Sequence, residues 1–312
     1  MDYLSSSSQP CLLVVFRLAI EEKKAEKKFG TARNFQRTLN SLTNFLGDKA
    51  ELPLSLVNED FVGTYNAWLL QRGVARNSVS FYMRVLRSIC NKLSRLYDFQ
   101  CTHLFRDVYT GVASTRKRAV NENILLKLQA LELRPKSHLA LSRDVFIFSY
   151  CARGMAFVDI AFLQKSDISD GVLCYVRRKT GQYLTVRIEP CMARIIKKYA
   201  AETAGSPYVF PFLRSLHPSV AYKQYQTALG YYNRVLKKLT ACLGLLHPLS
   251  SYTARHTWAT TARNHNVPIS VISAGMGHSS ERTTQIYLAS LDNSVIDKAN
   301  SMLLKSLNSY EG

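Results

Sequence analysis

Acidic residues are scarce in this sequence. It holds 22 Asp and Glu against 41 Lys and Arg, which gives a formal net charge of +19 and a pI near 9.7. Residues 1–110 carry 15 basic and 10 acidic side chains, so residues 111–312 carry 26 and 12. Such a surplus favours a polyanionic partner, and nucleic acid is the usual one. Composition alone also fits a basic domain without such a partner.

The cysteines form no Cys-x-x-Cys pair, although the chain has seven of them. Neither a zinc site nor a disulfide framework follows from this scatter, which favours a reducing cytoplasm. No carboxylate cluster suits two catalytic metal ions, and no glycine-rich loop is followed by the Lys and Ser/Thr of a nucleotide site. We therefore expect no metal and no cofactor.

Long apolar runs are also missing. The longest run near the start, Cys11 to Phe16, is too short to span a bilayer. Met1-Asp2-Tyr3 before it lacks the basic residues of a signal peptide. We expect neither a membrane-spanning segment nor an export signal.

A length of 312 residues with 47% hydrophobic and 20% charged residues fits two ordinary globular domains. Helical periodicity dominates the first hundred residues, and residues 1–106 are expected to form a four-helix domain. Asn58 and Asn77 are predicted N-caps of its third and fourth helices.

Residues 107–118 have no apolar period, contain Gly and Ser, and end in three cations. We interpret them as an interdomain linker, with a solvated surface loop as the alternative. Residues 119–312 then form the second domain, whose first helix Asn121 is predicted to cap. It is mainly helical with one β-hairpin, in which residues 172–176 and 184–188 alternate and Lys179 lies at the tip.

Four short motifs follow one another between residues 148 and 288. They are Phe148-Ser-Tyr-Cys-Ala-Arg153-Gly, Val176-Arg-Arg-Lys179-Thr-Gly181, Tyr252-Thr-Ala-Arg255-His256-Thr257, and Gly277-His278 followed nine residues later by Tyr287. One such motif is weak, but four in order are specific. Together they resemble the tyrosine recombinase (phage integrase) family, and the helical residues 17–105 resemble its core-binding domain.

The resemblance implies a mainly α fold with a small β-hairpin or sheet. It would be a two-domain, C-shaped DNA clamp, made of a SAM-like core-binding domain and a catalytic domain. The implied activity is site-specific cleavage and rejoining of double-stranded DNA through a 3′-phosphotyrosyl intermediate, giving integration, excision or inversion. Because the phosphotyrosyl bond stores the energy of the broken bond, the reaction needs no ATP.

The resemblance also implies a role for each motif residue. Attack on a phosphodiester builds negative charge on the non-bridging oxygens, which two guanidiniums, Arg153 and Arg255, can bind. Tyr287 is the nucleophile, and Lys179 is the general acid for the leaving 5′-oxygen. His278 hydrogen-bonds the phosphate or handles the proton of Tyr287. Taken singly, each residue fits an ordinary structural role, so the assignment depends on the complete ordered set.

The sequence departs from the family pattern in two places. Tyr252 stands where the family usually has a histidine, which leaves the general base unassigned. The Tyr252 hydroxyl can still hydrogen-bond the phosphate, and neighbouring His256 is a candidate substitute, although beside Arg255 it should point elsewhere on the helix. The family's acidic residue, three places after the first arginine, is Ala156 here. The nearest carboxylate is Asp159, which we expect to support the site.

An apolar stripe follows the nucleophile, over a predicted last helix from Val295 to Leu307. Its members are Val295, Ile296, Ala299, Met302, Leu303 and Leu307. The helix can pack on its own domain or, as is common in the family, on a neighbouring protomer of a tetramer on DNA, which we favour. With few residues before the first helix, we expect no full arm-binding domain, which favours an invertase or a mobile-element enzyme.

Two other functions stay open at this point. A type IB topoisomerase shares the chemistry but acts alone and relaxes supercoils, and the apolar last helix argues against it. A DNA-binding regulator that has lost catalysis is supported by Tyr252 and opposed by the complete Arg, Lys, Arg, His, Tyr set. The DNA site, the direction of recombination and any accessory proteins are not encoded in recognisable motifs.

Overall fold

The computed structural model describes residues 11–47, 52–97, 99–113, 119–288, 300–302 and 304, and of Ile286 and Tyr287 it describes the backbone only. The chain divides into two compact units, Met1–Thr115 and Arg116–Gly312. Helices dominate both, and one small sheet lies in the second, so the predicted fold class is confirmed. Within the described residues, no helix is long and apolar enough to cross a membrane.

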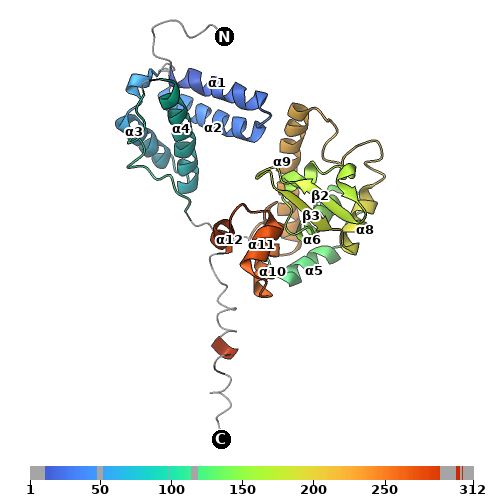
Figure 1. Cartoon of the computed structure of the whole chain (residues 1–312). Coiled ribbons are helices and arrows are strands. Elements are labelled where there is room, and N and C mark those ends of the chain that lie inside the picture. The colour runs from blue at the N-terminus through green and yellow to red at the C-terminus, as the bar shows by residue number, and fades with distance from the viewer. Residues whose placement is uncertain are drawn as a thin grey trace. The chain divides into compact units, whose positions relative to one another are not determined.

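The first unit is a bundle of four helices, as predicted (Figure 1). They are α1 (Leu12–Ala25), α2 (Phe29–Leu46), α3 (Glu59–Gln71) and α4 (Arg76–Leu96), with a 3-10 turn at Leu54–Leu56. Their apolar residues recur every three or four positions, as Phe35, Leu39 and Leu42 do in α2, so each helix buries one face in a shared core.

A side-chain N-cap explains where α3 begins, but α4 has none. The Asn58 side chain accepts a hydrogen bond from the Phe61 N–H and starts α3, as predicted. The prediction for Asn77 is wrong, because α4 already begins at Arg76. Its amide instead pairs with both backbone groups of Ala113, at 2.9 and 2.8 Å. The chain therefore packs against the first unit as far as residue 113.

The second unit is built around α6, which is buried on almost every side. Its helices are α5 (Glu122–Ala130), α6 (His138–Cys151), α7 (Phe157–Ala161), α8 (Pro190–Tyr199), α9 (Pro218–Cys242), α10 (Thr253–Asn264), α11 (Ile269–Met276) and α12 (Glu281–Leu288). Helices α5, α8, α9 and α10 all pack against α6 (Figure 1). Asn121 caps α5 as predicted, and Ser137 caps α6.

The sheet has three antiparallel strands in the order β1 (Ile168–Ser169), β2 (Val172–Val176) and β3 (Tyr183–Arg187). The predicted hairpin is confirmed, with Cys174 opposite Thr185. Leu173, Tyr175, Leu184 and Val186 all point into the core, while the alternate residues are more exposed. The tip of the hairpin, residues 177–182, is therefore carried on a rigid support.

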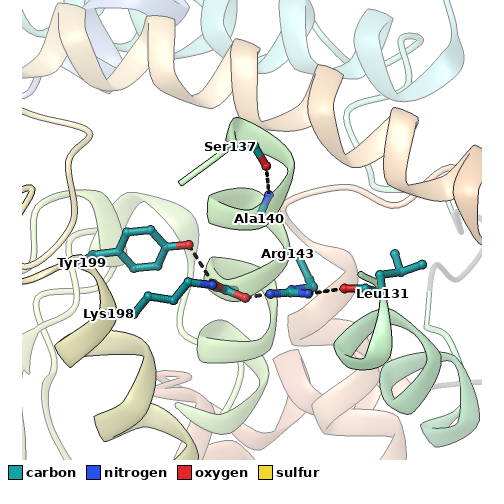
Figure 2. Close-up of polar contacts among 7 residues, drawn as sticks. Leu131, Ser137, Ala140, Arg143, Lys198 and Tyr199 are labelled. Atoms are coloured by element: carbon teal, nitrogen blue, oxygen red, sulfur yellow. Dashed lines mark hydrogen bonds and ion pairs between the residues drawn. The ribbon is translucent and has the colours of Figure 1, made fainter. Parts of the chain in front are cut away.

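A buried polar network joins α6 to α8 (Figure 2). Asp144 accepts hydrogen bonds from Arg143 Nε (2.8 Å), Lys198 Nζ (2.6 Å) and the Tyr199 hydroxyl (2.7 Å). Burial raises the pKa of Asp144, but the bonds from Lys198, Tyr199 and Arg143 outweigh it and lower the pKa overall. Since Arg143 also donates to the Leu131 carbonyl, the end of α5 is tied to the same network.

The predicted last helix, Val295 to Leu307, lies mostly outside the described residues. Residues 300–302 within it are helical. Its position in the assembly stays a prediction.

Candidate active site

Arg153 sits in a strained backbone conformation directly after α6. The helix ends at Cys151, and the Gly154 N–H bonds back to the Ser149 carbonyl at 2.8 Å, as in a Schellman motif. In that motif the left-handed residue is usually glycine, yet here Arg153 has a φ of +57°. Within the described part of the chain, no residue pairs with the Arg153 guanidinium, so its charge is available to a ligand.

Arg255 is held from both ends of its guanidinium. It lies on α10, is only 3% exposed, and donates to the Gly154 carbonyl (2.8 Å) and the Met276 carbonyl (2.6 Å). Gly154 has a φ of +72°, and a Cβ there would lie 2.8 Å from the Arg255 Cα. Only glycine fits this place, so Arg153 and Arg255 are brought together by the close approach of their backbones.

His278 lies against Arg255. Its Nε2 is 3.1 Å from Arg255 Nη2, and its Nδ1 is 2.8 Å from the Thr284 hydroxyl. Because a guanidinium can only donate, Nε2 accepts and the proton of the neutral ring is on Nδ1. Burial lowers the pKa of His278 to about 4, with further contributions from the positive charges of Arg255, Arg177 and Lys179. His278 is therefore neutral at pH 7.

We predict that His278 titrates far below an ordinary histidine in the DNA-free protein. Between pH about 6.5 and 4 the unfolded chain binds more protons at this residue, so its contribution to stability declines as the pH falls through that window. NMR titration of the histidine ring signals should show one midpoint near 4, absent in His278→Gln. A midpoint of 6 or above for the signal that His278→Gln removes would contradict this electrostatic account.

The hairpin tip brings Lys179 to the same region. Lys179 is exposed. The tip is tied to the His278 turn because Arg177 Nη1 and the Thr180 hydroxyl both donate to the Gly277 carbonyl. Gly277 has a φ of +62°, and a Cβ there would lie 2.7 Å from Leu184 Cδ1. The hairpin and the turn therefore pack too closely to move separately.

Arg177 is a site residue that the sequence analysis missed. It is 5% exposed, and its Nε is buried without a partner among the described residues. The signal was present in the strand alternation, because Leu173 and Tyr175 point inwards and position 177 continues their side of the strand. The guanidinium is a buried positive charge between the lysine and histidine motifs.

Asp159 on α7 is a buried carboxylate close to these arginines. Its Oδ1 accepts the Arg178 N–H at 2.9 Å, and its Oδ2 is buried without a partner among the described residues. Burial raises its pKa, although the positive charges of Arg177 and Arg255 act in the opposite direction. The carboxylate thus holds the tip of the hairpin at Arg178.

Tyr287 lies in the last turn of α12, and its side chain is outside what the structure describes. The helix is fixed on both sides of this position. Thr284, one turn earlier, bonds His278, and the Leu288 carbonyl accepts from Arg263 on α10. Figure 1 shows α10, α11 and α12 next to one another, and they share a small apolar core.

Tyr252 is the N-cap residue of α10 and is 46% exposed. Its ring centroid is 6.3 Å from that of His256. Within the described residues, no three His, Cys, Asp or Glu side chains are grouped closely enough to hold a metal ion.

Comparison with known proteins agrees with the family that the four motifs predict. A family model described as a phage integrase SAM-like domain matches residues 11–93, and one described as the phage integrase family matches residues 129–294. The chain belongs to the phage integrase family of tyrosine recombinases. This confirms the family and the enzyme class that the four motifs predicted.

Individual relatives are distant. A tyrosine recombinase of Pseudothermotoga lettingae is 27% identical over 229 residues, which are 69% of this chain and 75% of that protein. A lambda integrase tetramer bound to a Holliday junction superposes with a TM-score of 0.64 at 16% identity, covering 90% of this chain and 78% of that one. XerH recombinase in a post-cleavage complex with difH substrate superposes with a TM-score of 0.63 at 14% identity, covering 94% of this chain and 95% of that one. At these identities the structural likeness concerns the fold.

Proposed function

We propose that this recombinase cleaves one DNA strand at a specific site with Tyr287, leaving a 3′-phosphotyrosyl bond and a free 5′-hydroxyl, and then rejoins it to a partner strand. The observation that carries the proposal is the Arg255 guanidinium. It donates hydrogen bonds to the carbonyls of Gly154 and Met276 and lies beside neutral His278. Gly154 is the residue that directly follows Arg153. A second guanidinium, that of Arg153, is carried by a different element, and two guanidiniums can together stabilise the charge of a pentavalent phosphate.

The proton steps are assigned to the remaining residues. Lys179 on the exposed hairpin tip donates to the leaving 5′-oxygen, as a general acid. His278, neutral and within reach of Arg255, hydrogen-bonds a phosphate oxygen or accepts the proton of Tyr287. The exposure of Tyr252 at the start of α10 supports a phosphate contact through its hydroxyl, while His256 is the other candidate base.

Arg177 and Asp159 are proposed to position these groups without touching DNA. Both are buried, and they hold the two ends of one connection, from α7 through the hairpin to the Gly277 turn. A displacement of about 1 Å at a catalytic group can cost about 100-fold in rate, so the connection matters for cleavage.

We predict that Arg177→Met slows single-turnover cleavage by about 10- to 100-fold and leaves DNA affinity unchanged. The pKa of His278 should rise in this variant, because Arg177 is one of the charges that lower it. Fluorescence binding measures the DNA affinity, quenched single-turnover assays measure the cleavage rate, and NMR titration measures the pKa of His278. Arg187→Met, an exposed arginine on the same sheet, is the control. Unchanged cleavage together with an unchanged His278 pKa would exclude the positioning role.

The first domain, residues 1–106, is proposed to bind the core DNA site as a SAM-like domain, with residues 107–118 as the linker to the second domain. A groove of about 720 Å³ along α4 supports a phosphate-binding face. Its basic lining residues are Arg87, Arg95, His103 and Arg106. Affinity dominated by such contacts should fall steeply with salt concentration.

Assembly is proposed as a tetramer on two duplex sites, with the last helix docked on a neighbouring protomer. The solved lambda integrase tetramer on a Holliday junction supports the possibility of such an assembly in this fold. We propose that the protein is the recombinase of a mobile element. It is proposed to act in the cytoplasm, since all seven cysteines are free thiols and the substrate is DNA.

A duplex nicked near the scissile phosphate tests the activity. The short fragment released by cleavage diffuses away, so the wild type should accumulate a covalent adduct and Tyr287→Phe none. Absence of the adduct with the wild type would leave only a DNA-binding regulator. Relaxation of supercoiled plasmid carrying no target site would instead indicate a type IB topoisomerase.

A further inference from the structure

Cys151 and Cys191 face each other between α6 and α8. Their sulfur atoms are 3.3 Å apart, although both are free thiols. A disulfide requires an S–S distance of about 2.0 Å, so a small approach of the two helices would join them. Cys151 is the last residue of α6, two positions before Arg153.

Cys191 opens onto a small basic cavity. The cavity measures about 170 Å³ and has Arg143, Arg194 and Lys198 in its lining, with Asp144 as its acidic residue. Arg143 and Lys198 both donate hydrogen bonds to Asp144 (Figure 2). Three cations against one carboxylate favour a negatively charged ligand. Cys191 is also the second residue of α8.

We propose that Cys191 and Cys151 form a redox-sensitive modification site that takes a small, carboxylate-bearing disulfide of the glutathione type. The basic cavity binds the carboxylates, which brings the S–S bond to Cys191.

The exchange takes place in two steps. The Cys191 thiolate attacks one sulfur of the small disulfide, which forms a mixed disulfide and releases one thiolate. Cys151 then attacks the Cys191 sulfur, its proton passes to the departing thiolate, and an intramolecular disulfide forms. Two electrons thus move from the cysteine pair to the small disulfide. Burial raises the pKa of Cys151 to about 12, so Cys151 is a protonated thiol at neutral pH and gives up its proton as it attacks.

The bond would act on the catalytic arginine. Closing the sulfur atoms from 3.3 Å to about 2.0 Å moves the last turn of α6, from which the left-handed Arg153 projects. Because such a shift at a catalytic group can cost about 100-fold, the oxidised protein should cleave DNA about tenfold or more slowly than the reduced one. This effect on cleavage rests on the proposed function.

Full-length protein treated with glutathione disulfide, then assayed on the nicked substrate, provides the test. Wild type should lose two hydrogen atoms by intact mass, cleave about tenfold or more slowly, and recover with dithiothreitol. Cys151→Ser should stop at a glutathionyl adduct on Cys191, and Cys191→Ser should keep its rate. Cys242→Ser, which removes an exposed thiol, is the control and should behave as wild type.

Two results would overturn the proposal: no Cys151–Cys191 bond by peptide mapping, or an oxidised protein that cleaves at the reduced rate. Failure of the reduced protein to form any adduct would instead count against the proposed function, and the mass measurement would still report on the thiol pair.

Discussion

Replacing Arg153 by glycine is expected to give a protein that is more stable and cleaves DNA far more slowly. A non-glycine residue in the left-handed conformation costs about 1 kcal/mol, which glycine would recover. Loss of one guanidinium that stabilises the pentavalent phosphate should lower the cleavage rate on the order of 10³-fold. Stability and activity should thus change in opposite directions at this one position.

Thermal or denaturant unfolding measures the first effect, and single-turnover cleavage the second. Lys136→Gly is the matched control, because Lys136 also has a positive φ (+57°) but lies in the exposed turn before α6. It should gain similar stability and keep its cleavage rate. Arg153→Ala should lose cleavage without the gain in stability. If Arg153→Gly cleaves at the wild-type rate, Arg153 is not a phosphate ligand.

Arg255→Lys should be damaging in both respects, although it keeps the positive charge. A lysine cannot bond the Gly154 and Met276 carbonyls and His278 at once in the geometry of the guanidinium. Leaving buried carbonyls without a donor should cost about 2 kcal/mol of stability. Loss of bidentate phosphate binding should lower cleavage on the order of 10³-fold.

Cleavage should be compared at a temperature where both proteins are fully folded, so that the two effects stay separate. Arg187→Lys, an exposed arginine on β3, should behave as wild type. An Arg255→Lys protein with normal cleavage would show that charge alone suffices and would contradict the bidentate role.

Much of the fold could be predicted from local patterns. The hairpin was predicted because alternation and a Thr-Gly turn are short-range signals, and the caps at Asn58 and Asn121 because the side chain bonds a nearby N–H. The cap at Asn77 failed for a tertiary reason. Its amide is used by Ala113, 36 residues away, and no local pattern encodes that contact.

The site residues also divide into those that local motifs predict and those that only the packing of the chain brings together. The motif residues could be named because their types and order are specific, and the structure brings Arg255 beside Gly154 and His278. The coupling through Arg177 to the Gly277 carbonyl joins positions 100 residues apart, and the facing of Cys151 and Cys191 joins positions 40 apart. Such contacts depend on how helices and the sheet pack, which periodicity does not specify.

Locating the covalent bond tests the central claim most directly. The adduct trapped on the nicked substrate would be digested with nuclease and protease, and the nucleotide-bearing peptide identified by mass spectrometry. We predict a single modified peptide with the phosphate on Tyr287, joined to the 3′ end of the cleaved strand. A phosphate on Tyr252 or any other residue, or a bond to the 5′ end, would contradict the account.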